Sequence, residues 1–298
     1  MEINTATLRS ANIGFNAAFA RGLGMAPSLY QRVATVVPSS TKSQDYGWLG
    51  KVPRYREWLG DRVINAMAKH GYTLTNKSYE NTIGVDRDDF EDDNLGMYAP
   101  LFEELGAAAN AFPDELVFGL LKTGFTTKCY DGQYFFDTDH SVLDEAGNPV
   151  SVSNSGGGAG TGWYLMDVSR PLKPLIFQSR KPFDKLVRMD KEDDPNVFMR
   201  KEYLYGSDGR CEVGFGFWQQ AYGSKQTLDA AAYEAARGVL MGMKGDYGRP
   251  LGLRPNLLVV PPSLEGAANK IVKNALTTGG ATNEWAGTAE VLVVPWLA

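Results

Sequence analysis

Apolar residues recur at the spacing of one helix face over residues 96–124, and this pattern predicts a long amphipathic helix. The apolar positions on its predicted buried face are Leu101, Leu105, Ala108, Phe112, Leu116, Leu120 and Leu121. Pro113 interrupts the pattern, because its ring removes a backbone donor and clashes with the preceding turn. We therefore expect either a kink at Pro113 or a second helix that begins there.

Residues 1–88 combine one short helical pattern with two strand-like segments. Ile13, Ala17 and Ala20 predict a helix over residues 10–22. The segments 43–50 and 72–87 are rich in Thr, Tyr and alternating polar residues, as half-buried strands are. Such a strand pair has little core of its own and needs another surface on which to lie.

The segment between these two strands is rich in arginine and aromatic residues, a composition typical of a protein interface. A surface helix of a globular domain would have a similar composition. The candidates for contacts between subunits are Trp48, Arg54, Tyr55, Arg56, Trp58 and Arg62.

The second half of the chain alternates predicted strands and helices. Residues 162–180 and 197–223 are predicted as strands, the latter as two strands joined by a turn at "GSDGR". A helix capped by Ser224 or Thr227 is expected to end before Gly245, and a second helix should begin at Ser263. The buried strand "NLLVV" and the terminal strand "AEVLVVPWLA" complete an α+β layout without internal repeats.

The stretch "VDRDDFEDDN", residues 85–94, has six carboxylates in ten positions, and a calcium loop is one explanation for them. Such a loop needs a glycine at its sixth position and a bidentate carboxylate at its twelfth. A loop that begins at Asp89 has Asn94 and Pro100 at these positions, and one that begins at Glu91 has Phe102 at the twelfth. Neither alignment satisfies both requirements, so we do not expect a metal site here.

A helix start explains the same carboxylates better. They precede the predicted long helix, whose amino-terminal end carries a partial positive charge and unpaired amides. Asp93 or Asn94 is therefore expected to cap this helix with its side chain.

Composition narrows the classes of function. The chain has 298 residues and a net charge of −5, so it lacks the basic surface typical of nucleic-acid-binding proteins. Cys129 and Cys211 are too few and too far apart for a disulfide framework or a zinc knuckle, and we expect buried thiols. The amino terminus lacks the order of a signal peptide, and no segment has the apolar length of a membrane span. We expect a soluble intracellular chain.

The motif "FDTDH" is the strongest candidate for catalytic or metal chemistry. Asp137, Asp139 and His140 could form part of a metal site or a base with its orienting carboxylate. A polar loop is the preferred interpretation, because aspartates in turns bond to their own backbone. The glycine run at 153–162 lacks the lysine and hydroxyl residue of a phosphate loop, and we interpret it as a flexible surface loop. We predict no catalytic, cofactor or metal residue.

Four segments carry a resemblance to a known family. They are "SSTKSQDYGWLGKVPRYREWLG", "NKSYENTIGVDRDDFEDDNLGMYAPLFEELG", "CYDGQYFFDTDH" and "LGLRPNLLVVPPSLEGAANKIV". They resemble the Mu-like prophage major head subunit family over essentially the whole chain. This resemblance implies the Hong Kong 97-type capsid fold of tailed phages.

The implied parts follow the order of the predicted elements. An amino-terminal arm would cover residues 1–43 and an extended loop with a strand pair residues 44–88. A peripheral domain would cover 89–223, with a spine helix at about 96–124 and a sheet built from the strands between 163 and 223. An axial domain with the terminal strand would cover 224–298.

The resemblance implies a major capsid protein that assembles into hexamers and pentamers of an icosahedral head around phage DNA. Its expected partners are further copies of itself, scaffold and portal proteins during assembly, and a decoration protein on some shells. DNA would be packaged without sequence-specific binding, and no membrane would be involved. The expected location is the virion, after assembly in the bacterial host cytoplasm. Two alternatives remain open at this point: a cellular nanocompartment shell of the same fold, and a hydrolase using Asp137, Asp139 and His140.

Overall fold

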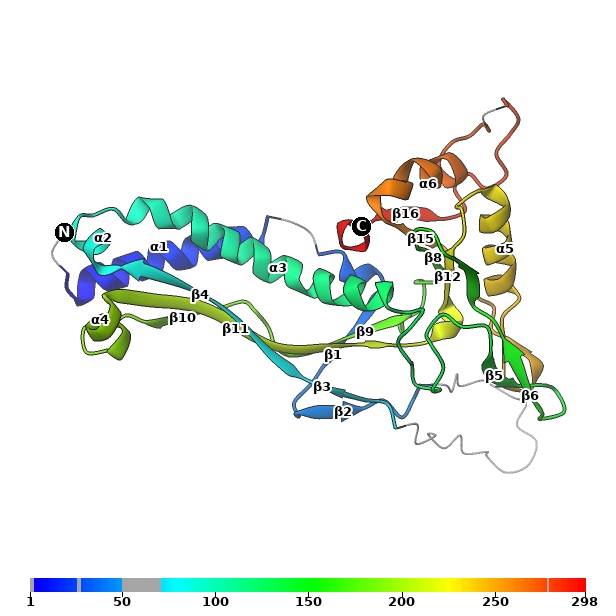
Figure 1. Cartoon of the computed structure of the whole chain (residues 1–298), viewed down its shortest axis with the longest axis horizontal. Helices are drawn as coiled ribbons and strands as arrows, with labels where there is room; N and C mark the ends of the chain where they lie inside the picture. The colour runs from blue at the N-terminus through cyan, green and yellow to red at the C-terminus, as the bar shows by residue number, and fades with distance from the viewer. Residues whose placement is uncertain (1–2, 26–27, 50–70, 278) are drawn as a thin grey trace.

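The computed structural model of the chain describes residues 3–25, 28–49, 71–277 and 279–298. An elongated part holds two long helices alongside a twisted sheet, and a more compact part at one end holds a second sheet with two further helices (Figure 1). The two long helices are α1 (Thr5–Leu23) and α3 (Ala99–Lys122). The expected helices over 10–22 and 96–124 are thus confirmed.

The first sheet has the strand order β1-β9-β11-β10, and β4 pairs with β11 as well. Its strands are β1 (Ala34–Pro38), β4 (Lys77–Asp86), β9 (Leu175–Lys181), β10 (Leu186–Met189) and β11 (Glu202–Phe215). β11 runs antiparallel to β4, β9 and β10, whereas β1 runs parallel to β9. β11 is therefore the strand on which the elongated part is built.

The prediction of a turn at "GSDGR" is wrong, because these residues lie within the continuous strand β11. Gly206 and Gly209 are needed here for close packing and not for a turn. A Cβ atom on Gly206 would lie 2.6 Å from Oγ1 of Thr82, and one on Gly209 would lie 2.5 Å from the ring of Phe183. Ladder hydrogen bonds to β4 keep the segment extended along its whole length.

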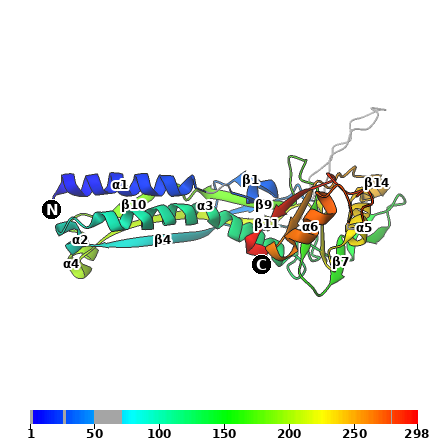
Figure 2. The ribbon, with the colours of Figure 1, turned by 90° about the horizontal axis from the view of Figure 1, so that it is seen from above.

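The helices α1 and α3 pack side by side on this sheet (Figure 2). Phe15 of α1 stacks on Phe102 of α3, with ring centroids 4.2 Å apart. Both rings also form T-shaped contacts with Tyr205 from β11, with centroids 5.1 and 5.7 Å apart. This aromatic group forms the centre of the core of the elongated part.

The second sheet has the order β16-β15-β8-β12-β7. Its strands are β7 (Ser155–Gly158), β8 (Trp163–Met166), β12 (Ala221–Lys225), β15 (Leu257–Val260) and β16 (Glu290–Val293). The helices α5 (Ala230–Met241) and α6 (Glu265–Val272) belong to this part (Figure 1). The expectation that the strands between 163 and 223 form one sheet is wrong. β8 and β12 pair with the late strands, whereas β9 and β11 belong to the first sheet.

The glycine run also has a different structure from the expected loop. Residues 155–158 form strand β7, which pairs in parallel with β12. A Cβ atom on Gly156 would lie 2.6 Å from Oγ of Ser224, so the close approach of these two strands requires glycine there.

Three two-stranded sheets complete the described strands. They are β2 (Ser43–Asp45) with β3 (Thr73–Thr75), β5 (His140–Leu143) with β6 (Pro149–Val152), and β13 (Lys244–Gly245) with β14 (Arg249–Pro250). The pairing of β2 with β3 confirms the expected strand pair. After β3 the chain continues past Asn76 into β4, which belongs to the first sheet.

The acidic stretch precedes α3, as expected, but it does not cap that helix. It forms a short helix of its own, α2 (Arg87–Glu91), and the side chain of Asp86 caps it by accepting from the amide of Asp88 at 2.8 Å. Asp93 adopts a left-handed conformation with φ 57°, and Asn94 makes no side-chain cap. The 3-10 turn Leu95–Tyr98 separates the carboxylates from the start of α3, which places them too far back to cap it.

The remaining helix starts also differ in detail from the predictions. α3 passes through Pro113 as one helix, so no second helix begins there. The cap of α5 is Asp229, whose carboxylate accepts from the amide of Ala232 at 2.8 Å, and neither Ser224 nor Thr227. At Ser263 a 3-10 turn (Pro262–Leu264) intervenes before α6. The short helix α4 (Pro195–Arg200) lies between β10 and β11.

Candidate functional site

The three residues of the "FDTDH" motif do not converge on one point. Asp137 accepts hydrogen bonds from the backbone amides of Tyr134 and Thr138, and Asp139 is exposed. His140 is fully buried and turns to a different partner, since its Nδ1 lies 2.7 Å from Oδ2 of Asp131. The chemistry proposed for a hydrolase would need these groups to face one substrate, which this arrangement does not provide.

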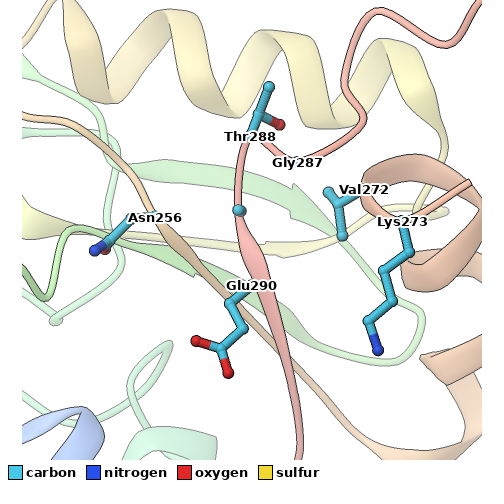
Figure 3. A pocket seen from close by; sticks show the side chains of 7 residues that line it. Asn256, Val272, Lys273, Gly287, Thr288 and Glu290 are labelled. Carbon is cyan, nitrogen blue, oxygen red and sulfur yellow. The ribbon is translucent and has the colours of Figure 1, made fainter. Parts of the chain in front are cut away.

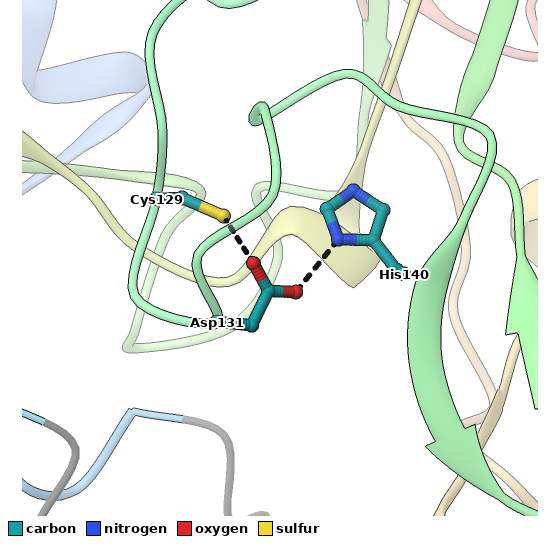
Figure 4. A group of neighbouring side chains, drawn as sticks. All are labelled: Cys129, Asp131 and His140. Atoms are coloured by element: carbon teal, nitrogen blue, oxygen red, sulfur yellow. Dashed lines mark hydrogen bonds and ion pairs between the residues drawn. The ribbon is translucent and has the colours of Figure 1, made fainter. Parts of the chain in front are cut away.

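The structure brings together Cys129, Asp131 and His140 instead (Figure 4). The Asp131 carboxylate lies between the other two side chains, and Cys129 Sγ donates to its Oδ1 at 3.1 Å. A carboxylate can only accept hydrogen bonds, so the hydrogen between Asp131 and His140 belongs to Nδ1. The imidazole also stacks on the indole of Trp218, with centroids 3.8 Å apart and an angle of 7° between the planes.

The electrostatics of this cluster favour a structural role. Burial raises the pKa of the Cys129 thiol far above its ordinary value, and the nearby Asp131 carboxylate raises it further. The sulfur is therefore a protonated donor and not a nucleophile. Burial alone would raise the pKa of the Asp131 carboxyl, but hydrogen bonds from His140 and Cys129 outweigh it and lower this pKa below its usual value.

Among the described residues, these three are the group whose ligand atoms lie close enough for a metal ion, all within 4.8 Å of one another. Binding a cation would require the thiolate form of Cys129, which burial disfavours, and would break both hydrogen bonds to Asp131. The arrangement fits a set of hydrogen bonds that holds residues 129–140 together, with His140 stacked on Trp218, better than a metal centre.

Asn154 connects the same loop to the second sheet. It is fully buried, and its Nδ2 donates to the carbonyl groups of Phe135, Trp218 and Ala221, while its Oδ1 accepts from the amide of Asp137. Sequence reasoning did not single it out, because an asparagine in a glycine-rich segment usually indicates a turn.

A surface hollow of about 480 Å³ lies between α6, β16 and the start of β15 (Figure 3). Lys273 and Glu290 are the ionisable residues that line it, and they lie apart from one another in the close-up. Glu290 is already paired with Arg32, with its two carboxylate oxygens 2.9 and 2.5 Å from the guanidinium nitrogens. The hollow is therefore open to solvent, and its carboxylate is already bonded to Arg32, so we assign no site to it.

Of the predicted contact residues, only Trp48 lies within the described part of the chain. It is half-buried against Tyr46 and Phe217, with ring centroids 5.7 and 5.8 Å away. This ring therefore packs within its own chain and anchors the start of the predicted loop. The other predicted contact residues, Arg54, Tyr55, Arg56, Trp58 and Arg62, lie outside the described residues.

The sequence reasoning missed an exposed apolar surface formed by α4 and β10. Phe198 and Met199 of α4 are 84% and 76% exposed, and Val187 and Met189 of β10 are also exposed. We call these four residues the α4 tip. The signal in the sequence was the apolar pair in "PNVFMRK", directly after the charged run "KEDD".

Comparison with known proteins gave consistent results. The family model described as "Mu-like prophage major head subunit gpT" matches residues 8–297. The major capsid protein of Escherichia phage Mu is 44% identical over 306 residues, which cover 100% of both chains. The Mu-like prophage FluMu major head subunit of Haemophilus influenzae is 46% identical over 271 residues, covering 89% of this chain and 88% of that protein.

Solved structures of phage shells are also similar. A subunit of the procapsid of bacteriophage JBD30 has a TM-score of 0.86 and 49% identity, covering 99% of this chain and 100% of that one. A subunit of the JBD30 capsid has a TM-score of 0.76 and 37% identity, with 100% of both chains covered. For the JBD30 capsid decorated with minor capsid protein trimers, the TM-score is 0.76, the identity 38% and the coverage 93% of both chains.

Proposed function

Since the chain belongs to the Mu-like prophage major head subunit family and is a major capsid protein of a tailed phage, we propose that it assembles into hexamers and pentamers of an icosahedral head shell around phage DNA. The observation that carries this proposal is the full-length match to the phage Mu major capsid protein at 44% identity. The chain is a structural protein and not an enzyme. A cellular nanocompartment shell is not favoured, because the neighbours with high TM-scores are phage capsids.

The two sheets support a division into capsid subdomains that differs from the sequence-based boundaries. We assign the first sheet to the peripheral domain, with α3 as its spine helix and with α1 of the arm packed beside α3. The second sheet with α5 and α6 would be the axial domain, which then includes β8 and β12 as well as the late strands. The arm would precede β1, and the extended loop would begin at the β2–β3 pair.

The conformation of the chain favours its assignment to a precursor form of the shell. The likeness is greater to the JBD30 procapsid subunit, with a TM-score of 0.86, than to the JBD30 capsid subunit, with 0.76. In our proposal, the described conformation is that of the precursor, and maturation of the head changes the relation between its parts.

The proposed partners follow from this role. The subunit binds further copies of itself, and scaffold and portal proteins during assembly in the bacterial host cytoplasm. A decoration protein is included because the related JBD30 capsid carries minor capsid protein trimers. The net charge of −5 suits a shell that encloses DNA without holding it tightly or reading its sequence.

The arginine and aromatic residues between the loop strands are proposed as contacts with a neighbouring subunit. Arg54, Tyr55, Arg56, Trp58 and Arg62 have the composition of residues that dominate binding energy at interfaces. Trp48 would support them from within the chain, because it fixes the start of the loop against Phe217.

Electron microscopy of the purified, concentrated protein tests the proposed function. We expect closed shells or free hexamers and pentamers, either from the protein alone or on coexpression with its scaffold protein. A protein that stays monomeric under both conditions would refute the proposal.

A further inference from the structure

The short 3-10 turn η1 (Tyr30–Arg32) lies between the arm and β1 and is bonded to other parts of the chain. α3 holds its first residue, because the amide of Tyr30 donates to Oδ1 of Asp114 at 2.5 Å. The carbonyl of Gln31 accepts from Nζ of Lys173, which belongs to the segment that connects β8 to β9. This segment passes from the second sheet to the first. η1 is therefore fixed both to the long helix and to a connection between the two sheets.

The bond between η1 and α3 is a buried anchor. Asp114 is buried, and its carboxylate also accepts from the amide of Leu29 at 2.9 Å and from Oγ of Ser28 at 3.2 Å. Taking these donors away would leave a buried carboxylate without partners, which is strongly unfavourable. This side of η1 is therefore resistant to opening.

The third residue of η1 reaches the second sheet. Arg32 forms two parallel hydrogen bonds with the carboxylate of Glu290 in β16, which points away from Lys273 in the close-up (Figure 3). Burial lowers the pKa of the Lys173 ammonium, and the nearby charge of Arg32 lowers it further, so Glu290 offsets one of two adjacent cations. The side chains of Arg32 and Glu290 are 34% and 64% exposed, so opening this pair returns both charges to water. The contact with the second sheet is therefore easier to break than the bond to Asp114.

We propose that η1 is a joint that sets the orientation of the second sheet relative to the arm and α3. Asp114 is its fixed side, and the ion pair of Arg32 with Glu290 is its releasable side. This inference rests on the proposed function. The closed pair holds the subunit in the precursor form, and the pair opens when the shell changes to its mature form. Every subunit carries the same pair, so the pair opposes this change at each position of the shell.

Glu290→Gln tests the proposal, because it removes the charge and keeps the size of the side chain. Precursor shells of this variant and of the unmodified chain are warmed gently, and the fraction in the mature form is followed by electron microscopy. We expect the variant to convert about fivefold faster, which corresponds to about 1 kcal/mol of the barrier. Exchanging the two charges, with Arg32→Glu and Glu290→Arg together, should restore a rate near that of the unmodified shell.

Asp208→Asn is the matched control, because it also removes one carboxylate from a partly exposed ion pair. Asp208 pairs with Lys181 inside the first sheet, between β11 and β9. Shells of this variant should convert at the rate of the unmodified shell. If Glu290→Gln converts no faster than Asp208→Asn, the pair of Arg32 with Glu290 does not hold the precursor form, and the proposal is overturned.

The unassembled subunit tests the coupling separately from assembly. Asp114→Asn and Glu290→Gln act on opposite sides of η1, so their effects on the unfolding constant in urea should be non-additive if η1 transmits them. We expect the double variant to differ at least about threefold from the product of the two single effects, and a simple product would overturn the proposal. If Asp114→Asn does not fold, Ser28→Ala replaces it, since it removes one bond to Asp114. Failure of the unmodified chain to form any shell would instead contradict the proposed function.

Discussion

The contact between α1 and α3 gives the sharpest test of the described conformation. Gly22 and Gly106 lie where the two helices touch, and a Cβ atom added to either would meet the backbone of the other helix. On Gly106 it would lie 2.1 Å from the carbonyl oxygen of Phe19, and on Gly22 it would lie 1.9 Å from that of Glu103. The perturbation is Gly106→Ala, which adds one methyl group at this point.

The structure indicates how large the effect should be. Ordinary van der Waals contact begins at 3.4 Å, so the helices must separate before the methyl group can fit. The clash is with backbone, which cannot rotate away as a side chain can. Separation would also loosen the stack of Phe15 on Phe102. Overpacking typically costs about 1–3 kcal/mol, and we expect the upper end, about 3 kcal/mol, which lowers the melting temperature of a chain of this size by roughly 5–10 °C.

Gly119→Ala is the matched control in the same helix. Nothing lies within 4 Å of the added methyl group, and alanine favours helix over glycine by about 1 kcal/mol. The control should therefore melt slightly higher than the unmodified protein.

Thermal unfolding of the unassembled subunit and hydrogen exchange of the α1 amides measure the effect. We expect Gly106→Ala to lower the melting temperature and to speed exchange in α1. If Gly106→Ala and Gly119→Ala melt at the same temperature, the helices do not touch at Gly106, and the described conformation of the arm is wrong for the free subunit.

Three further predictions concern assembly, the acidic stretch and the buried cluster. Arg54→Ala with Trp58→Ala should leave a folded subunit whose shells do not close, because interface energy concentrates in such residues; a normal particle yield in electron micrographs would count against it. Asp86→Ala should lower the free energy of unfolding, measured by urea unfolding, by about 1 kcal/mol because the cap of α2 is lost. A chelator should leave the melting temperature of the unmodified protein unchanged, and a large drop in that temperature would revive the hypothesis of a metal site. His140→Ala should cost about 2 kcal/mol through the lost bond to Asp131 and the lost stack. Since the pKa of Asp131 is lowered on folding, its contribution to the free energy of unfolding is present above the unfolded pKa and is lost as the pH falls through the folded pKa. Asp131→Asn should remove this part of the loss of stability in acid, and an unchanged dependence of stability on pH would contradict the role given to Asp131.

The sequence alone determined the elements whose pattern is carried by neighbouring residues. The apolar face of residues 96–124 predicted α3, and the run "NLLVV" predicted the fully buried strand β15. The resemblance carried by long motifs identified the family, which the full-length matches then confirmed. These features are local, because helix periodicity and strand composition depend on residues within a few positions of one another.

The tertiary structure decided the features that depend on distant parts of the chain. "GSDGR" stays extended because β4 pairs with it from more than a hundred residues earlier, and Gly209 leaves space for the ring of Phe183. The partner of His140 is Asp131 rather than its neighbour Asp139, because burial against Trp218 turns the ring toward the 129–131 loop. Turn propensities amount to a fraction of a kcal/mol up to about 1 kcal/mol per residue, whereas a ladder of backbone hydrogen bonds and a buried aromatic contact together outweigh them. Local preference therefore predicts a helix, strand or turn only where no contact with a distant part of the chain stabilises a different conformation of the same residues.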